Sequence, residues 1–253
     1  MMRKIQITVV QLDNYGPWTV TPEPKPEPEL QVLQAEIYSY LQREFFKLKG
    51  MVFQSRQDNL IAVTNGIGTE KHREILERFC KNFPVTASMG IGTGLTAYEA
   101  QVNATLAVQG VGSSRSPERR RVVAGEPLRQ SEEGWVEIVH ADINHSTLFT
   151  DAKPIYDTHF LIQQTHLALA EQFLRRNGLA FYMGGDNFMI VANGIRDEEL
   201  IQIFGEIKRQ LGIELKAGIG EAPNAVDAAN MASRALQDIR LGKSSSLILR
   251  RSA

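Results

Sequence analysis

The sequence predicts an α+β protein made of two tandem ferredoxin-like domains, each a βαββαβ unit with an antiparallel sheet. Three observations lead to this prediction. The 253 residues suffice for two domains of ordinary size. The composition, with 43% hydrophobic and 23% charged residues, is that of a globular protein. Residues 44–105 match residues 172–233 without a gap, each number being 128 higher in the second copy, which indicates a duplicated domain.

The repeat is clearest in its small residues. The first strand also fits the second copy once the shift becomes 129, which places Asp13 on Asp142. The remaining matches pair Gly90-Ile91-Gly92 with Gly218-Ile219-Gly220, and Ala97, Ala100 and Ala104 with Ala225, Ala228 and Ala232.

The second half shows the order of elements best. Alternating apolar residues predict strands over 136–141, 179–183, 188–192 and 214–219. Apolar spacing typical of helices predicts helices over 154–176, 197–210 and 224–240, with Asp197 as the N-cap of the middle one. In this arrangement the helices cover one face of the sheet, and the first strand lies beside the second strand of the hairpin. Residues 246–249 predict an added edge strand.

The domain boundaries follow from composition. We expect an N-terminal domain over 1–112, a linker rich in Gly, Ser and Pro over 113–134, and a C-terminal domain over 135–253. The run Arg119-Arg120-Arg121 in the linker predicts a solvated basic face, with attraction of phosphate as the alternative. The prolines at 22, 24, 26 and 28 predict a stiff connector or a disordered loop before the first helix, with a partner-binding proline motif as the alternative.

Charge and residue usage exclude several classes of protein. A net charge of -1 disfavours a nucleic-acid partner, and the lack of a long apolar stretch disfavours a membrane or secretory segment, so we expect a cytoplasmic protein. The single cysteine excludes a disulfide framework and cysteine-rich metal sites, and Cys80 is expected to pack as an apolar group instead of acting as a nucleophile. The five histidines form no H-E-x-x-H motif, which disfavours a histidine zinc site.

The candidate site combines a glycine-rich turn with a second carboxylate. Gly184-Gly185-Asp186-Asn187 joins two apolar strands, and these residue types alone predict only a tight hairpin. Asp142, however, ends an apolar strand that the fold places beside Asp186, and an unpaired buried carboxylate would be costly. Two carboxylates suit Mg²⁺. Asp142 and Asp186 are therefore the predicted catalytic residues, and Asp142, Ile143 and Asp186 the predicted positions for one or two Mg²⁺ ions.

Neighbouring residues predict a site for a phosphorylated substrate. Gly184 and Gly185 allow close approach to the main chain, and the loop Asn144-His145-Ser146-Thr147 offers N–H groups and hydroxyls to phosphate. Lys216 is expected either to neutralise phosphate charge or to be an exposed sheet lysine, and His145 either to carry protons or to be a surface residue.

The first half differs at its turn. It carries Asp13 and Asp58 as secondary candidates, but Arg56-Gln57 replaces the two glycines, so phosphate cannot approach as closely. We therefore assign catalysis to the second half and expect Asp13 and Asp58 to be structural or regulatory.

These residues carry a family resemblance. Asp142-Ile143-Asn144 and the Gly184-Gly185-Asp186-Asn187-Phe188 hairpin resemble the palm-type nucleotidyl cyclases, including the GGDEF diguanylate cyclases, with Asn187 in place of the Glu of that motif. The opening run of 5–20, the tandem duplication and the Gly-Gly-Asp-Asn turn together are similar to archaeal GTP cyclohydrolase III.

The resemblance implies an activity. GTP would be opened by water at its imidazole ring to give a formylaminopyrimidine ribosyl monophosphate and phosphate, a product that feeds flavin and deazaflavin synthesis. It further implies two Mg²⁺ ions, K⁺ as activator and a homotetramer. For guanine recognition Asp157 is the candidate, with helix capping as its alternative role, and Asn187 joins the expected substrate-binding residues. Two other functions stay open: a nucleotidyl cyclase and a GTP-binding sensor without catalysis.

Overall fold

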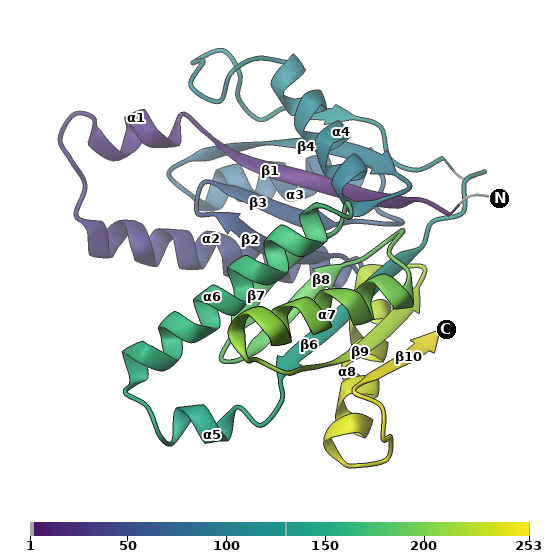
Figure 1. The fold of residues 1–253 in the computed structure, drawn as a ribbon. Coiled ribbons are helices and arrows are strands. Elements are labelled where there is room, and N and C mark those ends of the chain that lie inside the picture. The colour runs from purple at the N-terminus through teal and green to yellow at the C-terminus, as the bar shows by residue number, and fades with distance from the viewer. Residues whose placement is uncertain (1–2, 130, 253) are drawn as a thin grey trace. The chain divides into compact units, whose positions relative to one another are not determined.

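The chain forms two compact units, one built mainly from residues 3–135 and the other mainly from residues 136–252. The structure, a computed structural model, describes residues 3–129 and 131–252. Each unit contains one five-stranded sheet with helices packed against it (Figure 1). The α+β class and the duplicated plan predicted from the sequence are confirmed.

The predicted strands and helices occur in the predicted order in both units, and the short helices α1 and α5 and the strand β5 are additional. The N-terminal unit contains β1 (Ile5–Asp13), α1 (Tyr15–Val20), α2 (Glu27–Lys47), β2 (Met51–Arg56), β3 (Asn59–Val63), α3 (Thr69–Asn82), β4 (Thr86–Gly94), α4 (Ala97–Gly110) and β5 (Val123–Gly125). The C-terminal unit contains β6 (Val136–Ile143), α5 (Thr147–Thr150), α6 (Ile155–Leu174), β7 (Leu179–Gly184), β8 (Asn187–Val191), α7 (Asp197–Leu211), β9 (Leu215–Ala222), α8 (Ala225–Arg240) and β10 (Ile248–Ser252).

The two sheets have the same topology. Their strand orders are β2-β3-β1-β4-β5 and β10-β9-β6-β8-β7, so the first strand of each unit lies beside the second strand of its hairpin, as predicted. The first four strands of each unit pair antiparallel, whereas β5 and β10 pair parallel with β4 and β9 at one edge. The predicted edge strand is therefore confirmed with a later start, at Ile248. Its counterpart β5 was not predicted.

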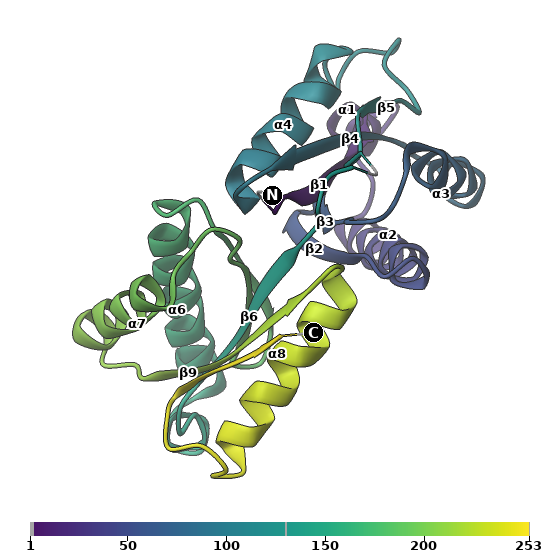
Figure 2. The ribbon, with the colours of Figure 1, turned by 90° about the vertical axis from the view of Figure 1, so that its right-hand side faces the viewer.

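Helices cover both faces of each sheet, which corrects the expectation of one covered face. In the C-terminal unit, Val139 and Ala141 of β6 belong to a buried core that also contains Phe173 of α6 and Ile203 of α7. The last helix of the unit, α8, packs against the other face, as Figure 2 shows. The alternation of side chains along β6 therefore sends one set of residues towards α6 and α7 and the other set towards α8.

The last helix of each unit, α4 or α8, approaches its sheet so closely that helix and strand backbones are in contact. A Cβ added to Gly218 would lie 2.0 Å from the Ala232 carbonyl oxygen, and one added to Gly90 would lie 2.0 Å from the Ala104 carbonyl oxygen. Only glycine fits against helix backbone at such a separation. We call these contacts the glycine–alanine seam, formed by Gly90 and Gly92 with Ala100 and Ala104, and by Gly218 and Gly220 with Ala228 and Ala232.

Strand register shows which residues of the two units correspond. Asp142 pairs with Asn187 on β8 and with Lys216 on β9. In the N-terminal unit, Gln11 pairs with Asn59 and with Ser88. These two residues match Asn187 and Lys216 of the C-terminal unit. The prediction that Asp13 matches Asp142 is therefore wrong. The N-terminal unit has an uncharged amide where the C-terminal unit has its first candidate carboxylate.

Asp13 lies two residues beyond Gln11, in a buried ion pair. Its Oδ1 accepts hydrogen bonds from Arg119 Nη2 at 3.1 Å and from Ser88 Oγ at 2.8 Å, and its Oδ2 accepts one from Thr86 Oγ1 at 3.0 Å. Arg119 also donates to Gln11 Oε1 at 2.6 Å and is only 2% exposed. The expectation of a solvated basic face is thus wrong for Arg119, although Arg120 is exposed.

The segment expected to be a linker packs within the N-terminal unit. It supplies β5, the buried Arg119, and a hydrogen bond from the Leu128 N–H to Gln6 Oε1 at 2.8 Å. Two local details near the helices also differ from expectation. A short helix, α1, precedes the proline-rich stretch, and α2 begins at Glu27, so Pro28 is helical. The N-cap of α7 is Arg196, which forms a capping box with Glu199, and Asp197 is the first helical residue.

No helix in the described ranges is long and apolar enough to cross a membrane.

Candidate active site

Asp142 occupies the last part of β6, at the edge of the packed core. The residue is 3% exposed, and its Oδ2 accepts hydrogen bonds from Arg240, from Nε at 2.9 Å and also from Nη2. Its Oδ1 is buried and accepts no hydrogen bond from any described residue, with Lys216 Nζ 3.5 Å away. A buried carboxylate oxygen without a hydrogen-bond donor is costly. The arrangement therefore leaves one oxygen of Asp142 available to a cation.

Asp186 sits in the turn between β7 and β8. Gly184 and Gly185, which precede it, have φ values of 105° and 60°. Such positive φ values favour glycine. A Cβ on Gly184 would meet nothing within 4 Å, so open space adjoins the turn. Asp186 is partly buried and has no ion-pair partner in the part of the chain that the structure describes.

Asn187 and Arg240 join the two carboxylates. The Asn187 amide donates from Nδ2 to Asp186 Oδ1 at 3.1 Å, and its Oδ1 accepts from Arg240 Nη2 at 3.2 Å. Because Arg240 also binds Asp142, one guanidinium and one amide connect both acidic side chains. Asp142 pairs with Asn187, the residue that follows Asp186 in the turn between β7 and β8. The two carboxylates therefore lie at the same end of the sheet, as the topology predicted.

His140 anchors this network from within the sheet. Its Nε2 lies 3.2 Å from Asn187 Oδ1 and its Nδ1 lies 3.0 Å from Ser233 Oγ. The amide oxygen can only accept, so Nε2 carries the proton and Nδ1 accepts from the Ser233 hydroxyl. Burial lowers the pKa of His140, and the neighbouring Arg240 guanidinium also lowers it. The imidazole is therefore held neutral in one tautomer.

The N-terminal unit lacks these features at the matching positions. Gln11 takes the place of Asp142 and donates to Asn59 Oδ1 at 2.8 Å. Arg56 takes the place of Gly184, and its Nη2 lies 2.8 Å from Asp58 Oδ2 in an ion pair. The carboxylate that corresponds to Asp186 is thus neutralised within its own turn. At these matching positions the C-terminal unit therefore has two carboxylates, Asp142 and Asp186, and the N-terminal unit has one, Asp58.

Other predicted residues lie at the same end of β6 but outside this network. Asn144 donates from Nδ2 to a Glu214 carboxylate oxygen at 2.6 Å, so its amide is engaged. His145 is exposed and has a positive φ of 57°, as expected for a surface residue. Ser146 and Thr147 begin the single-turn helix α5. Lys216 is not an exposed sheet lysine, because its side chain is 16% exposed and faces Asp142.

Asp157 lies in the first turn of α6, where Pro154 is the N-cap. The alternative role considered for Asp157, capping of this helix, is therefore wrong. Its side chain is exposed and forms no hydrogen bond or ion pair with the described residues, which leaves it free for a ligand.

Sequence reasoning missed two residues of the network, Arg240 and His140. Arg240 was only the last residue of a predicted helix. His140 lies two residues before Asp142 on the same strand, so the alternation of strand side chains places both on the face that α8 covers. That spacing was the available signal for His140.

The donor set fits a hard divalent cation. Mg²⁺ is usually held by one or two carboxylates, with water and substrate phosphate completing its shell. Asp142 and Asp186 supply two carboxylates, and Asp142 Oδ1, which has an ion pair with Lys216 but accepts no hydrogen bond from the described residues, supplies an oxygen that a cation would satisfy. The Ile143 side chain is buried in the core, so this residue could contribute only its main-chain carbonyl. Within the described residues, no group of three or more His, Cys, Asp or Glu side chains is placed to hold a metal by itself.

The fold and site define a duplicated α+β protein with two acidic side chains, Asp142 and Asp186, at one end of its C-terminal sheet. The family model for GTP cyclohydrolase III matches residues 5–250. The chain belongs to the GTP cyclohydrolase III family. The resemblance predicted from the sequence, and with it an enzyme of this type, is confirmed.

Two relatives show how far the similarity extends. GTP cyclohydrolase III of Methanothermobacter thermautotrophicus is 46% identical over 94% of this chain and 95% of its own length. The protein of the same name from Methanocaldococcus jannaschii is 46% identical over 93% of this chain and 88% of its own length. Among solved structures, the coiled coil and GGDEF domain of DgcB from Caulobacter crescentus is similar to 47% of this chain, with 70% of that structure's chain covered, at 18% identity and a TM-score of 0.40.

Proposed function

We propose that this protein hydrolyses GTP at Asp142 and Asp186 of its C-terminal unit, with a divalent cation held between the two carboxylates and the triphosphate. The observation that carries this proposal is the buried Asp142 Oδ1, which accepts no hydrogen bond in the described chain. Family membership supplies the substrate, because curated relatives are named GTP cyclohydrolase III.

The proposed reaction has two parts. Water adds to C8 of the guanine and the bond from C8 to N9 breaks, so that C8 remains on the other ring nitrogen as a formyl group. The triphosphate is hydrolysed to a monophosphate with release of phosphate. When bound, a divalent cation supplies Lewis-acid activation of water and neutralises charge on the phosphoryl oxygens.

The side chains around the pair have distinct proposed tasks. Arg240 and Lys216 already compensate the charge of Asp142, and both are suited to bind phosphate oxygens. The open space beside Gly184 gives the triphosphate access to the turn. Asn187, held by the neutral His140, keeps the Asp186 carboxylate in a fixed orientation. Asp157 is the proposed acceptor for the guanine N–H groups, since its carboxylate is exposed and unpaired.

The proposal is tested by incubating the protein with GTP, Mg²⁺ and K⁺ while following ultraviolet absorbance and phosphate. We expect loss of the purine spectrum together with release of orthophosphate. Release of pyrophosphate with an intact purine spectrum would instead identify a nucleotidyl cyclase. Unchanged GTP would leave a binding sensor, and either outcome refutes the proposal.

Matched variants test the location of the site. Asp142→Asn and Asp186→Asn should abolish turnover, whereas Asp58→Asn, the counterpart of Asp186 in the N-terminal unit, should leave it near the wild-type rate. Equal losses in Asp186→Asn and Asp58→Asn would contradict the assignment to the C-terminal unit.

Cation binding is tested separately from turnover. Electron paramagnetic resonance of Mn²⁺ titrated into the wild-type protein gives the number of bound ions, for which we propose two, and Asp142→Asn should weaken that binding. Replacing K⁺ by Na⁺ in the turnover assay tests the proposed activation by K⁺. Light scattering of the purified protein tests the proposed homotetramer.

A further inference from the structure

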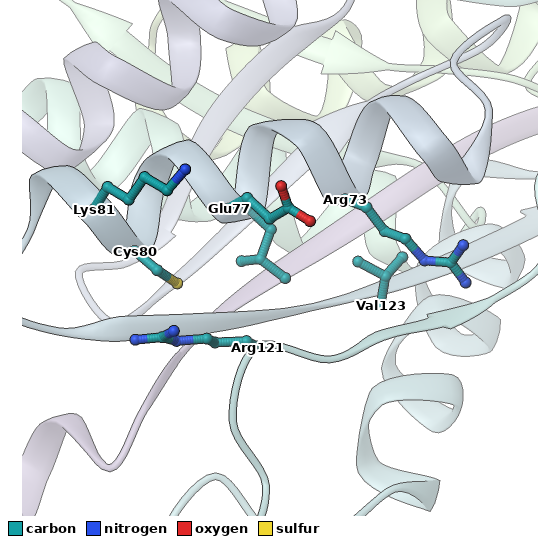
Figure 3. A pocket seen from close by; sticks show the side chains of 7 residues that line it. Arg73, Glu77, Cys80, Lys81, Arg121 and Val123 are labelled. Atoms are coloured by element: carbon teal, nitrogen blue, oxygen red, sulfur yellow. The ribbon is translucent and has the colours of Figure 1, made fainter.

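A cavity of about 270 Å³ lies within the N-terminal unit, between α3 and the segment that leads into β5. Figure 3 shows its side chains, which come from α3 on one side and from Arg121 and Val123 on the other. We propose that this cavity binds a small organic anion, in which a phosphate or carboxylate group is attached to an apolar body. Nothing in the proposed GTP hydrolysis uses these residues.

The charge of the cavity favours an anion. Its walls carry three cationic side chains, Arg73, Lys81 and Arg121, against one carboxylate, Glu77. Arg73 is paired with Glu70. The side chains of Lys81 and Arg121 form no hydrogen bond or ion pair with any residue in the described ranges. Cations that line a concave surface raise the local concentration of anions, and unpaired ones lose no existing partner when a ligand binds.

The backbone holds Arg121 at the cavity in an unusual conformation. Its φ is 59°, a left-handed value that is uncommon for a residue other than glycine. The Arg121 N–H donates to Asp13 Oδ2 at 3.2 Å, and the next N–H, of Val122, donates to Ser88 Oγ at 3.2 Å. Because Asp13 is fixed by the buried Arg119, the strained residue is held by an ion pair whose two side chains are both 0% exposed. Strain maintained by its surroundings is a feature of ligand sites.

The apolar side chains that line the cavity indicate the chemistry of the uncharged part of the ligand. Leu76 is 3% exposed and, with Val123 and the partly buried Cys80, forms an apolar surface. Such a surface suits an aliphatic or aromatic body of modest size, since small-molecule pockets are mostly apolar with a few placed polar groups. The Glu77 carboxylate provides an acceptor for one hydroxyl or amine of the ligand.

Cys80 offers a direct readout, because it is the only cysteine of the chain. Burial raises the pKa of its thiol. Because only the thiolate reacts, alkylation is carried out at a pH above the ordinary thiol pKa of about 8.5. The reagent is iodoacetamide, which is uncharged, and the reaction is followed by the intact mass of the protein. The probes are phenyl phosphate, benzoate and the neutral benzyl alcohol. At ten times its Kd, a ligand that covers Cys80 should slow alkylation about tenfold.

We expect a saturable slowing by phenyl phosphate or by benzoate, and none by benzyl alcohol at the same concentration. Whichever anion acts at the lower concentration identifies the charged group that the cavity prefers. Equal protection by benzyl alcohol, or no protection by either anion, overturns the proposal.

Variants locate the effect. Arg121→Asn removes the cation while keeping a residue that tolerates the left-handed conformation, and Lys81→Gln changes an exposed helical position. Both should weaken the protection at least several-fold, whereas Arg120→Gln, at the exposed neighbouring position outside the cavity, should not. Protection that is unchanged in both Arg121→Asn and Lys81→Gln, or lost equally in Arg120→Gln, contradicts the site. If Arg121→Asn has altered tryptophan fluorescence, Lys81→Gln decides the test.

Discussion

Replacing Arg119 by methionine should strongly destabilise the N-terminal unit. The side chains of Arg119 and Asp13 are both 0% exposed, with Nη2 and Oδ1 3.1 Å apart. In Arg119→Met the Asp13 carboxylate would keep its hydrogen bonds from Ser88, Thr86 and the Arg121 N–H but would lose its counter-charge. Breaking a buried pair by removing one partner costs about 3–5 kcal/mol.

Urea unfolding followed by tryptophan fluorescence measures this loss of stability in the N-terminal unit. The chain has two tryptophans, Trp18 and Trp135, and both belong to the N-terminal unit. For a slope of about 2 kcal/mol per molar urea, a loss of about 4 kcal/mol lowers the unfolding midpoint by about 2 M.

Two controls define the comparison. Lys71→Met removes an exposed pair with Glu74, whose side chains are 51% and 45% exposed, and should cost less than about 1 kcal/mol. The double variant Asp13→Asn with Arg119→Met should recover part of the loss, because it removes the orphaned charge. A midpoint in Arg119→Met no lower than in Lys71→Met would refute the reasoning.

Three further predictions concern other parts of the chain. Burial lowers the pKa of His72, so the unfolded chain binds a proton at a higher pH than the folded chain does. The stability of the N-terminal unit should therefore fall as the pH drops below about 6.5. Urea titrations above and below that pH measure this change, with His72→Gln as the control. Gly218→Ala should cost at least about 1–3 kcal/mol by forcing α8 from the sheet, whereas Gly205→Ala, in open space within α7, should stabilise by up to about 1 kcal/mol, both read from thermal unfolding by circular dichroism. Gly184→Arg copies the turn of the N-terminal unit and should abolish Mn²⁺ binding beside Asp186 in paramagnetic resonance with the far-ultraviolet spectrum unchanged; retained binding would count against an open C-terminal site.

The order and the approximate bounds of the strands and helices could be predicted from the sequence, because the same apolar patterns occur in both halves. The strands expected over 179–183 and 188–192 are β7 (Leu179–Gly184) and β8 (Asn187–Val191) in the structure. The helix expected over 224–240 is α8 (Ala225–Arg240). Strand alternation and helical spacing are local properties of the chain, so a single sequence contains them.

Register was not predictable in the same way. Gln11 and Asp13 are two residues apart, and a shift of two keeps every side chain of a strand on the same face. The apolar pattern of β1 therefore accepts either residue opposite Asn59, and matching by residue type chose the aspartate. The true partner depends on main-chain hydrogen bonds to β3 and β4, which residue identity does not reveal.

Buried charges depend on the folded surroundings and were also missed. Arg119 is one of three consecutive arginines, and nothing in that run distinguishes the one that reaches Asp13. Arg240 becomes part of the candidate site only because α8 lies on the face towards which Asp142 points. The ferredoxin-like pattern specifies two helices on one face, so the position of α8 had to come from the structure.

The glycine–alanine seam sets a limit on how such a duplicated chain can diverge. The N-terminal copy has Gln11 where the C-terminal copy has a carboxylate, and Arg56 where it has a glycine, yet all the seam positions carry the same residue types in both copies. A change of ligand chemistry needs only a new side chain at the end of a strand, whereas a larger residue in the seam must move a whole helix. In this architecture the strand ends can therefore change more readily than the seam, and the two copies remain recognisable by their shared glycines.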